Sequence, residues 1–347
     1  MARLEMRDES VTISKALGIM LMVLAHSGFS CIGDAAINMF HMPLFFFMSG
    51  YCFSDRHLIF PKSFMLGKIK TVYFPYIKYS LFFLVLHNVF CRLQFYKGGY
   101  YSLHDIIFQA SRIFMSMGLH DQLLGGYWFM GNLFWGLIIT FIFLKYCRNN
   151  AIVGIIISLA ISIIMNIFEF LIPVIRVGFS DFFSAAFILT GVFYKRKDLK
   201  FELKPYTVLP IACILVVLGT IYWRGCVPEI VAWKILPYYI TAITGTLAIF
   251  SISKIIVYCC RKRTFVNKIG GGTFAVLTWH FLCFKFVSWM IIVIYKLPLD
   301  TLAEFPVIHE YANNGWWVVY FLIGVVLPLG IDWLIRLFKE SLIILFK

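Results

Sequence analysis

Two residues that could do chemistry lie in one apolar run near the start of the chain. Residues 14–30 read SKALGIMLMVLAHSGFS, in which Lys15 comes early, His26 comes late and no charged residue lies between them. Eleven helical steps of about 100° return to within about 20° of the starting direction, so both side chains project from one helix face, about 16 Å apart along the axis. An ammonium group can bind a phosphate and an imidazole can act as a general base.

Both residues also have a simpler structural reading. A lysine near the end of a membrane span commonly anchors the helix at the interface, and this is the commoner role for Lys15 taken alone. A histidine within a span can be a hydrogen-bonded packing residue. However, a buried polar group in a membrane is costly and usually faces the bundle interior or a wet cavity, which favours the functional reading for His26.

His41 follows after a short link. The sequence continues CIGDAAINMFHMPLFFFMSGYCF, so His41 lies a few residues into the next apolar run, as His26 lies a few residues before the end of the first. The two imidazoles are therefore predicted to be level across a helical hairpin. They could share the duties of base and orienting group, or one could support the other through a hydrogen bond.

The elements that position these residues are predicted from composition. The chain has 347 residues, of which 61% are hydrophobic and 14% charged, and its mean hydropathy is +0.86. A membrane-spanning helix needs about 20 largely apolar residues. We therefore predict an all-α, polytopic integral membrane bundle of about ten transmembrane helices, forming a single membrane-embedded domain over residues 1–347. The ten segments are approximately residues 11–29, 36–54, 72–91, 127–146, 151–172, 178–194, 206–223, 234–258, 270–295 and 315–338.

The net charge of +14 does not point to nucleic acid, because the basic residues lie in short loops between the apolar segments. Such loops orient helices through the excess of Lys and Arg on the cytoplasmic side. The richest clusters lie in residues 56–70, 195–204 and 261–268, which alternate with sparsely charged loops. We therefore predict that both termini are cytoplasmic.

One predicted outer loop contains an amphipathic segment. In SLHDIIFQASRIFMSMG, Ser102 and Asp105 have the spacing of a capping box, and apolar residues follow at helical intervals. We expect a helix there that lies along the outer interface.

The order of these features resembles that of the acyltransferase-3 family of multispanning membrane O-acyltransferases. The resemblance rests on a basic residue, ten intervening positions and a histidine, here Lys15 to His26, followed by FHMPLFFFMSGY. The segments GKIKTVYFPY, YWFMGNLF and IGGGTFAVLTWHFLCFKF resemble later family motifs, in the same order and over most of the chain. The subgroup that the chain most resembles is that of the fucose 4-O-acetylase-like sugar acetyltransferases.

The resemblance implies an enzyme that moves an acetyl group from cytoplasmic acetyl-CoA to a hydroxyl of a cell-surface or lipid-linked sugar. It implies His26 as the catalytic base, with His41 beside it, and Lys15 as part of the acyl-CoA site. The chain carries Lys15 where many relatives have arginine, and Lys68 and Lys70 in place of an arginine pair. Lysine still binds phosphate as a point charge but loses bidentate geometry. We expect no metal, and we expect the enzyme to lie in the lipid bilayer of the bacterial cytoplasmic membrane.

Four further residues are candidates for binding the acceptor. Glu169 and Asp181 flank a predicted outer turn, where they could bind sugar hydroxyls or simply sit at the interface. Trp128, at an outer span end, could stack on a sugar or belong to the interfacial aromatic belt. His280, near the middle of the ninth segment, could line an acyl tunnel or be a satisfied core histidine.

Three questions stay open at the level of sequence. Transfer could be direct, with His26 as a general base, or could pass through an acyl-histidine. A transporter or flippase of a polysaccharide intermediate would also suit ten spans with scattered charge, although no internal symmetry is visible. The acceptor glycan, the length of the acyl chain and the oligomeric state are not specified.

Overall fold

The computed structural model describes residues 8–29, 31–118, 121–147, 149–260 and 263–345, and every regular element in these ranges is a helix. In chain order the helices are α1 Glu9–His26, α2 Cys31–Asn38, α3 His41–Tyr51, α4 Arg56–Ile59, α5 Pro61–Lys68, η1 Ile69–Tyr73, α6 Phe74–Arg92, α7 Leu103–Ser116, η2 Gln122–Tyr127, α8 Trp128–Tyr146, α9 Ala151–Ile167, α10 Phe179–Arg196, η3 Phe201–Leu203, α11 Pro205–Tyr222, η4 Ala232–Lys234, α12 Ile235–Cys259, α13 Thr264–Gly271, α14 Thr273–Tyr295, η5 Leu299–Ala303, α15 His309–Tyr311, η6 Ala312–Trp316 and α16 Trp317–Leu345. The prediction of an all-α chain is confirmed.

Each of the ten predicted segments overlaps at least one of these helices. Among the described residues, seven stretches are long and apolar enough to cross a membrane. They are Glu9–His26, Pro61–Arg92, Gln122–Tyr146, Pro205–Tyr222, Ala232–Cys259, Thr273–Tyr295 and His309–Ser341. The chain is therefore a polytopic membrane protein, whereas the count of about ten spans and the cytoplasmic location of the termini stay predictions.

The second predicted segment, 36–54, is not one helix. The chain breaks between α2 and α3, and α3 begins at His41. Pro43 explains the break, because proline has no N–H and its ring clashes with the carbonyl group four residues earlier, so it is tolerated only in the first turn of a helix. The proline therefore sets His41 as the first residue of α3.

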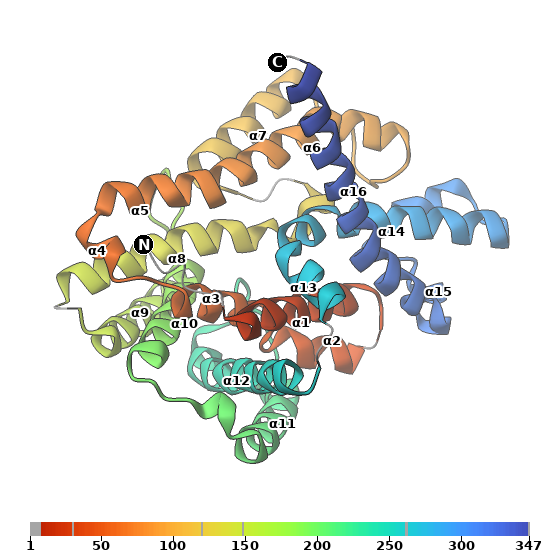
Figure 1. Cartoon of the computed structure of the whole chain (residues 1–347). Coiled ribbons are helices and arrows are strands. Elements are labelled where there is room, and N and C mark those ends of the chain that lie inside the picture. The colour runs from red at the N-terminus through yellow and green to blue at the C-terminus, as the bar shows by residue number, and fades with distance from the viewer. Residues whose placement is uncertain (1–7, 30, 119–120, 148, 261–262, 346–347) are drawn as a thin grey trace.

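Helix α1 lies in the middle of the bundle, where it packs against α3, α12, α13 and α16 (Figure 1). It begins at Glu9, and the carboxylate of the preceding N-cap residue Asp8 accepts the N–H of Ser10 at 3.0 Å. It ends at His26, two residues before Gly28, which has a φ of +78°. This left-handed conformation terminates a helix and favours glycine. A Cβ atom at Gly28 would also lie only 2.7 Å from Cβ of Ala312.

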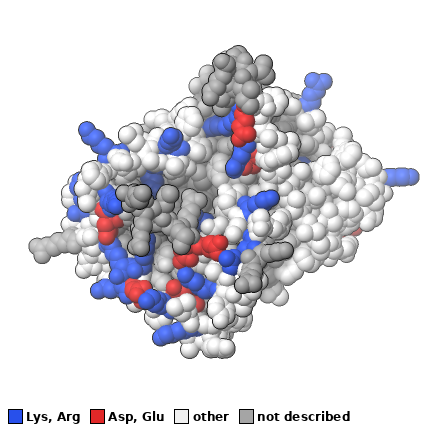
Figure 2. All heavy atoms as spheres, in the orientation of Figure 1, with Lys and Arg blue, Asp and Glu red and all other residues white. Residues whose placement is uncertain are grey.

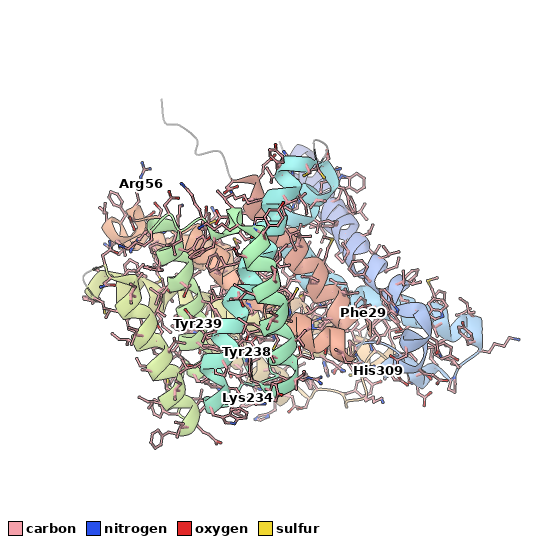
Figure 3. The ribbon with its side chains drawn as sticks, turned by 90° about the horizontal axis from the view of Figure 1, so that it is seen from below. Phe29, Arg56, Lys234, Tyr238, Tyr239 and His309 are labelled. Atoms are coloured by element: carbon pink, nitrogen blue, oxygen red, sulfur yellow. The ribbon has the colours of Figure 1, made fainter. Side chains whose placement is uncertain are left out.

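The predicted inner loops lie together at one end of the bundle. Arg196 at the end of α10 pairs with Asp55 after α3, and Lys254 of α12 pairs with Asp8 at 2.9 Å. Figure 2 shows many Lys and Arg side chains on the face in view, with acidic side chains among them. In Figure 3, Arg56 lies at one end of the bundle, whereas Phe29 and Lys234 lie toward the other. This arrangement agrees with the grouping of the basic clusters on one side.

The amphipathic helix predicted in the outer loop is α7, and its capping box is present. The Ser102 hydroxyl group accepts the N–H of Asp105, and the Asp105 carboxylate accepts the N–H of Ser102. The helix packs along α6, and the hydroxyl groups of Tyr73 and Tyr76 donate to the carbonyl oxygens of Phe114 and Gly118.

Candidate active site

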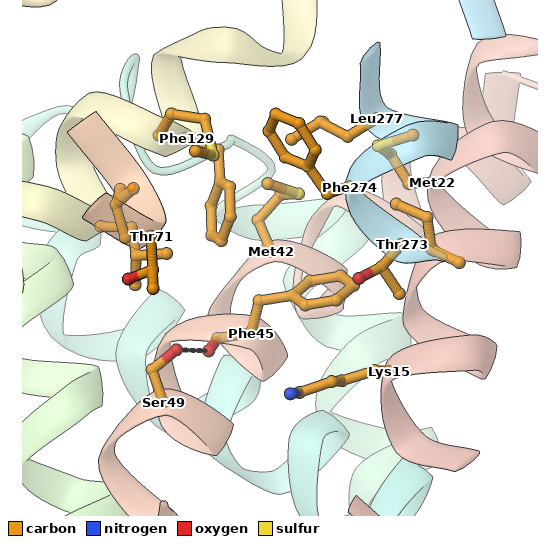
Figure 4. Close-up of a pocket in the computed structure, with 14 residues that line it drawn as sticks. Lys15, Met22, Met42, Phe45, Ser49, Thr71, Phe129, Thr273, Phe274 and Leu277 are labelled. Atoms are coloured by element: carbon orange, nitrogen blue, oxygen red, sulfur yellow. Dashed lines mark hydrogen bonds between the residues drawn. The ribbon is translucent and has the colours of Figure 1, made fainter. Parts of the chain in front are cut away.

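A cavity of about 290 Å³, here called the inner cavity, opens beside α1 between α3, η1, α8 and α14 (Figure 4). Its lining residues are Lys15, Ile19, Met22, Met42, Phe45, Ser49, Thr71, Val72, Phe129, Met130, Leu133, Thr273, Phe274 and Leu277. Lys15 is half-buried, and its ammonium group extends past Phe45 toward Ser49 (Figure 4). In the described part of the chain no carboxylate forms an ion pair with it. The cavity therefore offers an unpaired cation against largely apolar walls.

A second cavity of about 200 Å³, here called the outer pocket, lies at the other end of the same helix face. It is lined by Met22, His26, Asn38, His41, Met42, Gly126, Trp128, Cys226, Val227 and Tyr238. The structure thus brings His26, His41 and Trp128 together. Lys15 and His26 are placed on one face of α1, with Met22 between them bordering both cavities.

His26 is hydrogen-bonded to His280 of α14, with 3.2 Å between Nδ1 of His26 and Nε2 of His280. On its other side, His280 Nδ1 lies 2.9 Å from the carbonyl oxygen of Val276 and 3.1 Å from that of Leu277. A carbonyl oxygen only accepts, so Nδ1 of His280 carries a proton, and in the neutral ring Nε2 is then an acceptor. His26 must donate from Nδ1. Its Nε2 therefore carries the lone pair of a base.

His41 is fixed in the same way but by a different partner. Its ring is buried, and Nδ1 lies 2.9 Å from the carbonyl oxygen of Ile37 in the preceding helix. Nδ1 therefore donates and Nε2 keeps a lone pair. His41 shares the outer pocket with His26, but the residue that supports His26 through a hydrogen bond is His280, not His41.

Aromatic rings hold the histidine pair in place. Phe281 stacks on His26 with ring centroids 4.9 Å apart, and it lies 3.9 Å from the ring of His280. Phe305, from the loop after α14, packs on Phe281 at 4.7 Å. His280 itself is fully buried. Rotation of the His26 ring away from its partner would break these contacts.

Lys68 and Lys70 lie next to the inner cavity but do not line it. Lys68, at the end of α5, is half-buried with its ammonium 5.4 Å from the centroid of the Phe64 ring, and Lys70 is exposed. The following residues, Thr71 and Val72, are the ones that reach the cavity wall. The two lysines are thus placed near its rim.

Glu169 and Asp181 line neither cavity. Glu169 is exposed in the turn after α9. Asp181 is buried, and its carboxylate accepts the N–H of Gly178 at 2.8 Å, at the first turn of α10. The structure therefore gives Asp181 a capping role, and a glycine three residues before an acidic residue at the start of an apolar run was a visible signal for it. His280 likewise lies behind His26, and is not among the residues that line either cavity.

The outer pocket contains polar residues that sequence reasoning missed. The Asn38 amide donates to Asp34 at 2.7 Å, while its backbone carbonyl oxygen accepts the Tyr238 hydroxyl at 2.9 Å. Asn38 lies three residues before His41, in the short link that joins the two histidine-bearing segments. That position in the sequence could have marked Asn38 as a neighbour of His41.

Cys226 also lines the outer pocket, in the loop between α11 and α12. Burial, together with the nearby Glu229 carboxylate, raises the pKa of the Cys226 thiol to about 12. The thiol therefore stays protonated near neutral pH and is a poor nucleophile. In the described ranges, no three His, Cys, Asp or Glu side chains are close enough together to hold a metal ion.

The fold and the site describe a polytopic membrane protein in which one cavity contains the imidazole of His26 and the neighbouring cavity contains the ammonium group of Lys15. A family model described as an acyltransferase domain, of the acyltransferase-3 type, matches residues 8–333. The chain therefore belongs to the acyltransferase-3 family and is a membrane acyltransferase. No curated protein and no solved structure matches it significantly.

Proposed function

We propose that this enzyme transfers an acetyl group from cytoplasmic acetyl-CoA to a hydroxyl group of a cell-surface or lipid-linked sugar, as the fucose 4-O-acetylase-like subgroup does. The observation that carries the proposal is the pair of adjoining cavities, one containing Lys15 and the other containing the lone pair of His26. A donor made inside the cell can thereby meet an acceptor that lies outside. We place the enzyme in the bacterial cytoplasmic membrane.

The donor occupies the inner cavity. Its phosphates bind Lys15, with Lys68 and Lys70 at the rim, and its pantetheine arm extends along α1. The distance of about 16 Å that separates Lys15 from His26 along the helix is comparable to the reach of that arm. The apolar walls suit the thioester end, and the unpaired ammonium group suits an anion.

The acceptor occupies the outer pocket. Trp128 offers a flat surface on which a sugar ring can stack, and His41 and Asn38 offer polar groups beside it. Glu169 and Asp181 are left out of this site because neither lines the pocket, and the Asp181 carboxylate is engaged in capping α10.

The reaction begins when Nε2 of His26 takes the proton of a sugar hydroxyl group. The sugar oxygen attacks the carbonyl carbon of the thioester, the carbon–sulfur bond breaks, and the CoA sulfur leaves with the proton returned by His26. The products are an acetyl ester and free CoA. While His26 is charged, Nε2 of His280 accepts its Nδ1–H and so stabilises the imidazolium. General-base catalysis of this kind contributes about 10² to 10⁴ in rate.

The test uses purified full-length protein reconstituted in lipid vesicles. Radiolabelled acetyl-CoA is supplied with a panel of free and lipid-linked sugars, and both ester formation and thiol release are measured. We expect one molecule of free CoA for each ester formed. His26→Ala should lower the rate by about 10² to 10⁴. His104→Ala is the matched control, because this exposed histidine of α7 lines neither cavity.

Two results would contradict the proposal. Absence of label on every acceptor with the wild-type protein would remove the transferase function, and movement of an unmodified lipid-linked sugar across the membrane would support a flippase instead. A His26→Ala variant as active as His104→Ala would remove the catalytic assignment alone.

A further inference from the structure

Two methionines border both the inner cavity and the outer pocket. Among the described residues that line the two cavities, only Met22 and Met42 line both. Met22 belongs to α1 and Met42 to α3, and their exposed fractions are 1% and 5%. Figure 4 shows both side chains on the wall of the inner cavity, near Phe274 and Leu277. A group that reached directly from one cavity into the other would have to pass these two side chains.

The reacting carbon has to lie at this boundary. In the proposed function, on which this inference rests, that carbon is bonded first to a sulfur in the inner cavity and then to an oxygen beside His26 in the outer pocket. The rest of the acyl group is attached to the same carbon. We propose that Met22 and Met42 determine which acyl groups the enzyme accepts, by limiting the space for the acyl chain at the junction of the cavities.

The other walls near the junction leave little room to adapt. Gly126 of the outer pocket already packs on Leu277, since a Cβ atom at Gly126 would lie 2.8 Å from Cδ1 of Leu277. On the inner side, Phe45 and Phe129 pack against each other with ring centroids 5.8 Å apart. Methionine is unbranched and flexible, so it can give way to a small group and then refill the space. These side chains are thus the adjustable part of the boundary.

If the methionines limit the space for the acyl chain, the enzyme strongly prefers a short acyl group. Substitution of either methionine by alanine should weaken this preference. Met42→Ala and Met22→Ala each remove most of a side chain at the junction and leave space for a longer chain. We measure kcat/KM for acetyl-, propionyl- and butyryl-CoA with the sugar acceptor found for the wild-type enzyme. The ratio of acetyl to butyryl transfer should fall by about tenfold or more in each variant, as expected when a pocket gains room for extra methylene groups.

Met48→Ala is the matched control. Met48 lies on α3 with Met42 and is fully buried, but it lines neither cavity. It reports the effect of losing a buried methionine, and its acyl preference should equal that of the wild type. A complementary variant, Met42→Phe, fills the junction, so it should slow acetyl transfer by about tenfold or more while the dissociation constant of CoA changes less than twofold.

The outcomes separate the two proposals. If the wild-type enzyme transfers no acetyl group to any acceptor, the proposed function fails. If the wild-type enzyme does transfer acetyl groups, but every active alanine variant keeps the wild-type ratio of acetyl to butyryl transfer, the methionines do not determine the length of the acyl chain. Unimpaired acetyl transfer by Met42→Phe would overturn the inference independently, even if the alanine variants do not fold.

Discussion

The inner cavity and the outer pocket share one face of α1 but differ in chemistry. The inner cavity has apolar walls, one unpaired ammonium group, and the hydroxyl groups of Ser49 and Thr71, which donate to the carbonyl oxygens of Phe45 and Gly67. The outer pocket has two imidazoles whose Nδ1 atoms are hydrogen-bonded and whose Nε2 atoms have no hydrogen-bond partner among the described residues. Under the proposed function, the inner cavity binds the donor and the reaction takes place in the outer pocket. Substitutions in the first should therefore change KM for the donor, and substitutions in the second should change kcat.

A third histidine, His87, shows that a catalytic histidine needs an open cavity beside it as well as a charged partner. His87 of α6 lies 3.7 Å from the Asp121 carboxylate, which also accepts the Tyr96 hydroxyl at 2.7 Å. Because a carboxylate lies beside the imidazole, His87 and Asp121 look more like a catalytic pair than His26 and His280 do. Yet the His87 ring is covered by Tyr101, with centroids 3.6 Å apart, and it lines neither the inner cavity nor the outer pocket. We therefore regard the His87 cluster as structural.

Among the substitutions that test the difference between the inner cavity and the outer pocket, His280→Phe is expected to change kcat the most. Phenylalanine keeps a ring behind His26 but offers no acceptor for its Nδ1–H, so His26 is free to rotate or to move its proton to Nε2. We expect kcat to fall by roughly 10²-fold, the lower part of the range for a general base, while KM for acetyl-CoA stays unchanged.

His280→Gln is the companion variant, because its amide oxygen can accept the same hydrogen bond and should restore part of kcat. Steady-state kinetics over a range of donor concentrations separates the two constants. A His280→Phe enzyme with wild-type kcat would show that His280 does not position His26.

The next largest effect concerns the cation of the inner cavity. Lys15→Met keeps the length of the side chain and removes its charge, so it should raise KM for acetyl-CoA by about tenfold, equivalent to about 1.4 kcal/mol of binding, with kcat nearly unchanged. Lys15→Arg should keep most of the affinity, because it keeps the charge. Isothermal titration calorimetry with CoA measures the dissociation constant of CoA directly. A Lys15→Met enzyme that binds CoA as tightly as the wild type would show that this lysine only anchors α1.

Some of this arrangement could be predicted from the sequence because it depends on local periodicity. Lys15 and His26 stand eleven residues apart on one helix, so their common face follows from helical geometry alone. The capping box at Ser102 is equally local. In contrast, the hydrogen bond between His26 and His280 joins residues 254 positions apart, and it depends on how α1 packs against α14. No pattern within either helix specifies that packing.

Glu169 and Asp181 show a limit of reasoning from position alone. They flank a predicted outer turn, but that position does not say where their side chains point. Gly178 and Asp181 had the spacing of a helix start, and local capping determines the place of the Asp181 carboxylate. The break before His41 was likewise readable, since Pro43 allows a helix only from about that point.

A smaller effect is expected at the rim of the inner cavity. Exposed charges contribute little, because solvent and salt screen them. Lys70 is such a charge, so Lys70→Met should raise KM for acetyl-CoA by only about threefold at low ionic strength. The effect should disappear at high salt, whereas that of Lys15→Met should persist because Lys15 is half-buried. A tenfold loss of CoA affinity in Lys70→Met that survives high salt would instead place Lys70 in direct contact with phosphate.

The smallest effect is expected from Cys226→Ser in the outer pocket. Because the pKa of this thiol is raised to about 12, the thiolate fraction is very small at neutral pH and grows only as the pH approaches 12. A thiol in that state cannot be the acyl carrier of a rapid reaction, so kcat should stay within about twofold of the wild type. Alkylation of Cys226 should correspondingly accelerate as pH rises, and mass spectrometry of the labelled peptide measures its rate. If Cys226→Ser abolished transfer, or if an acyl group were trapped on Cys226, the outer pocket would work through a covalent cysteine and the role of His26 would be to activate that thiol.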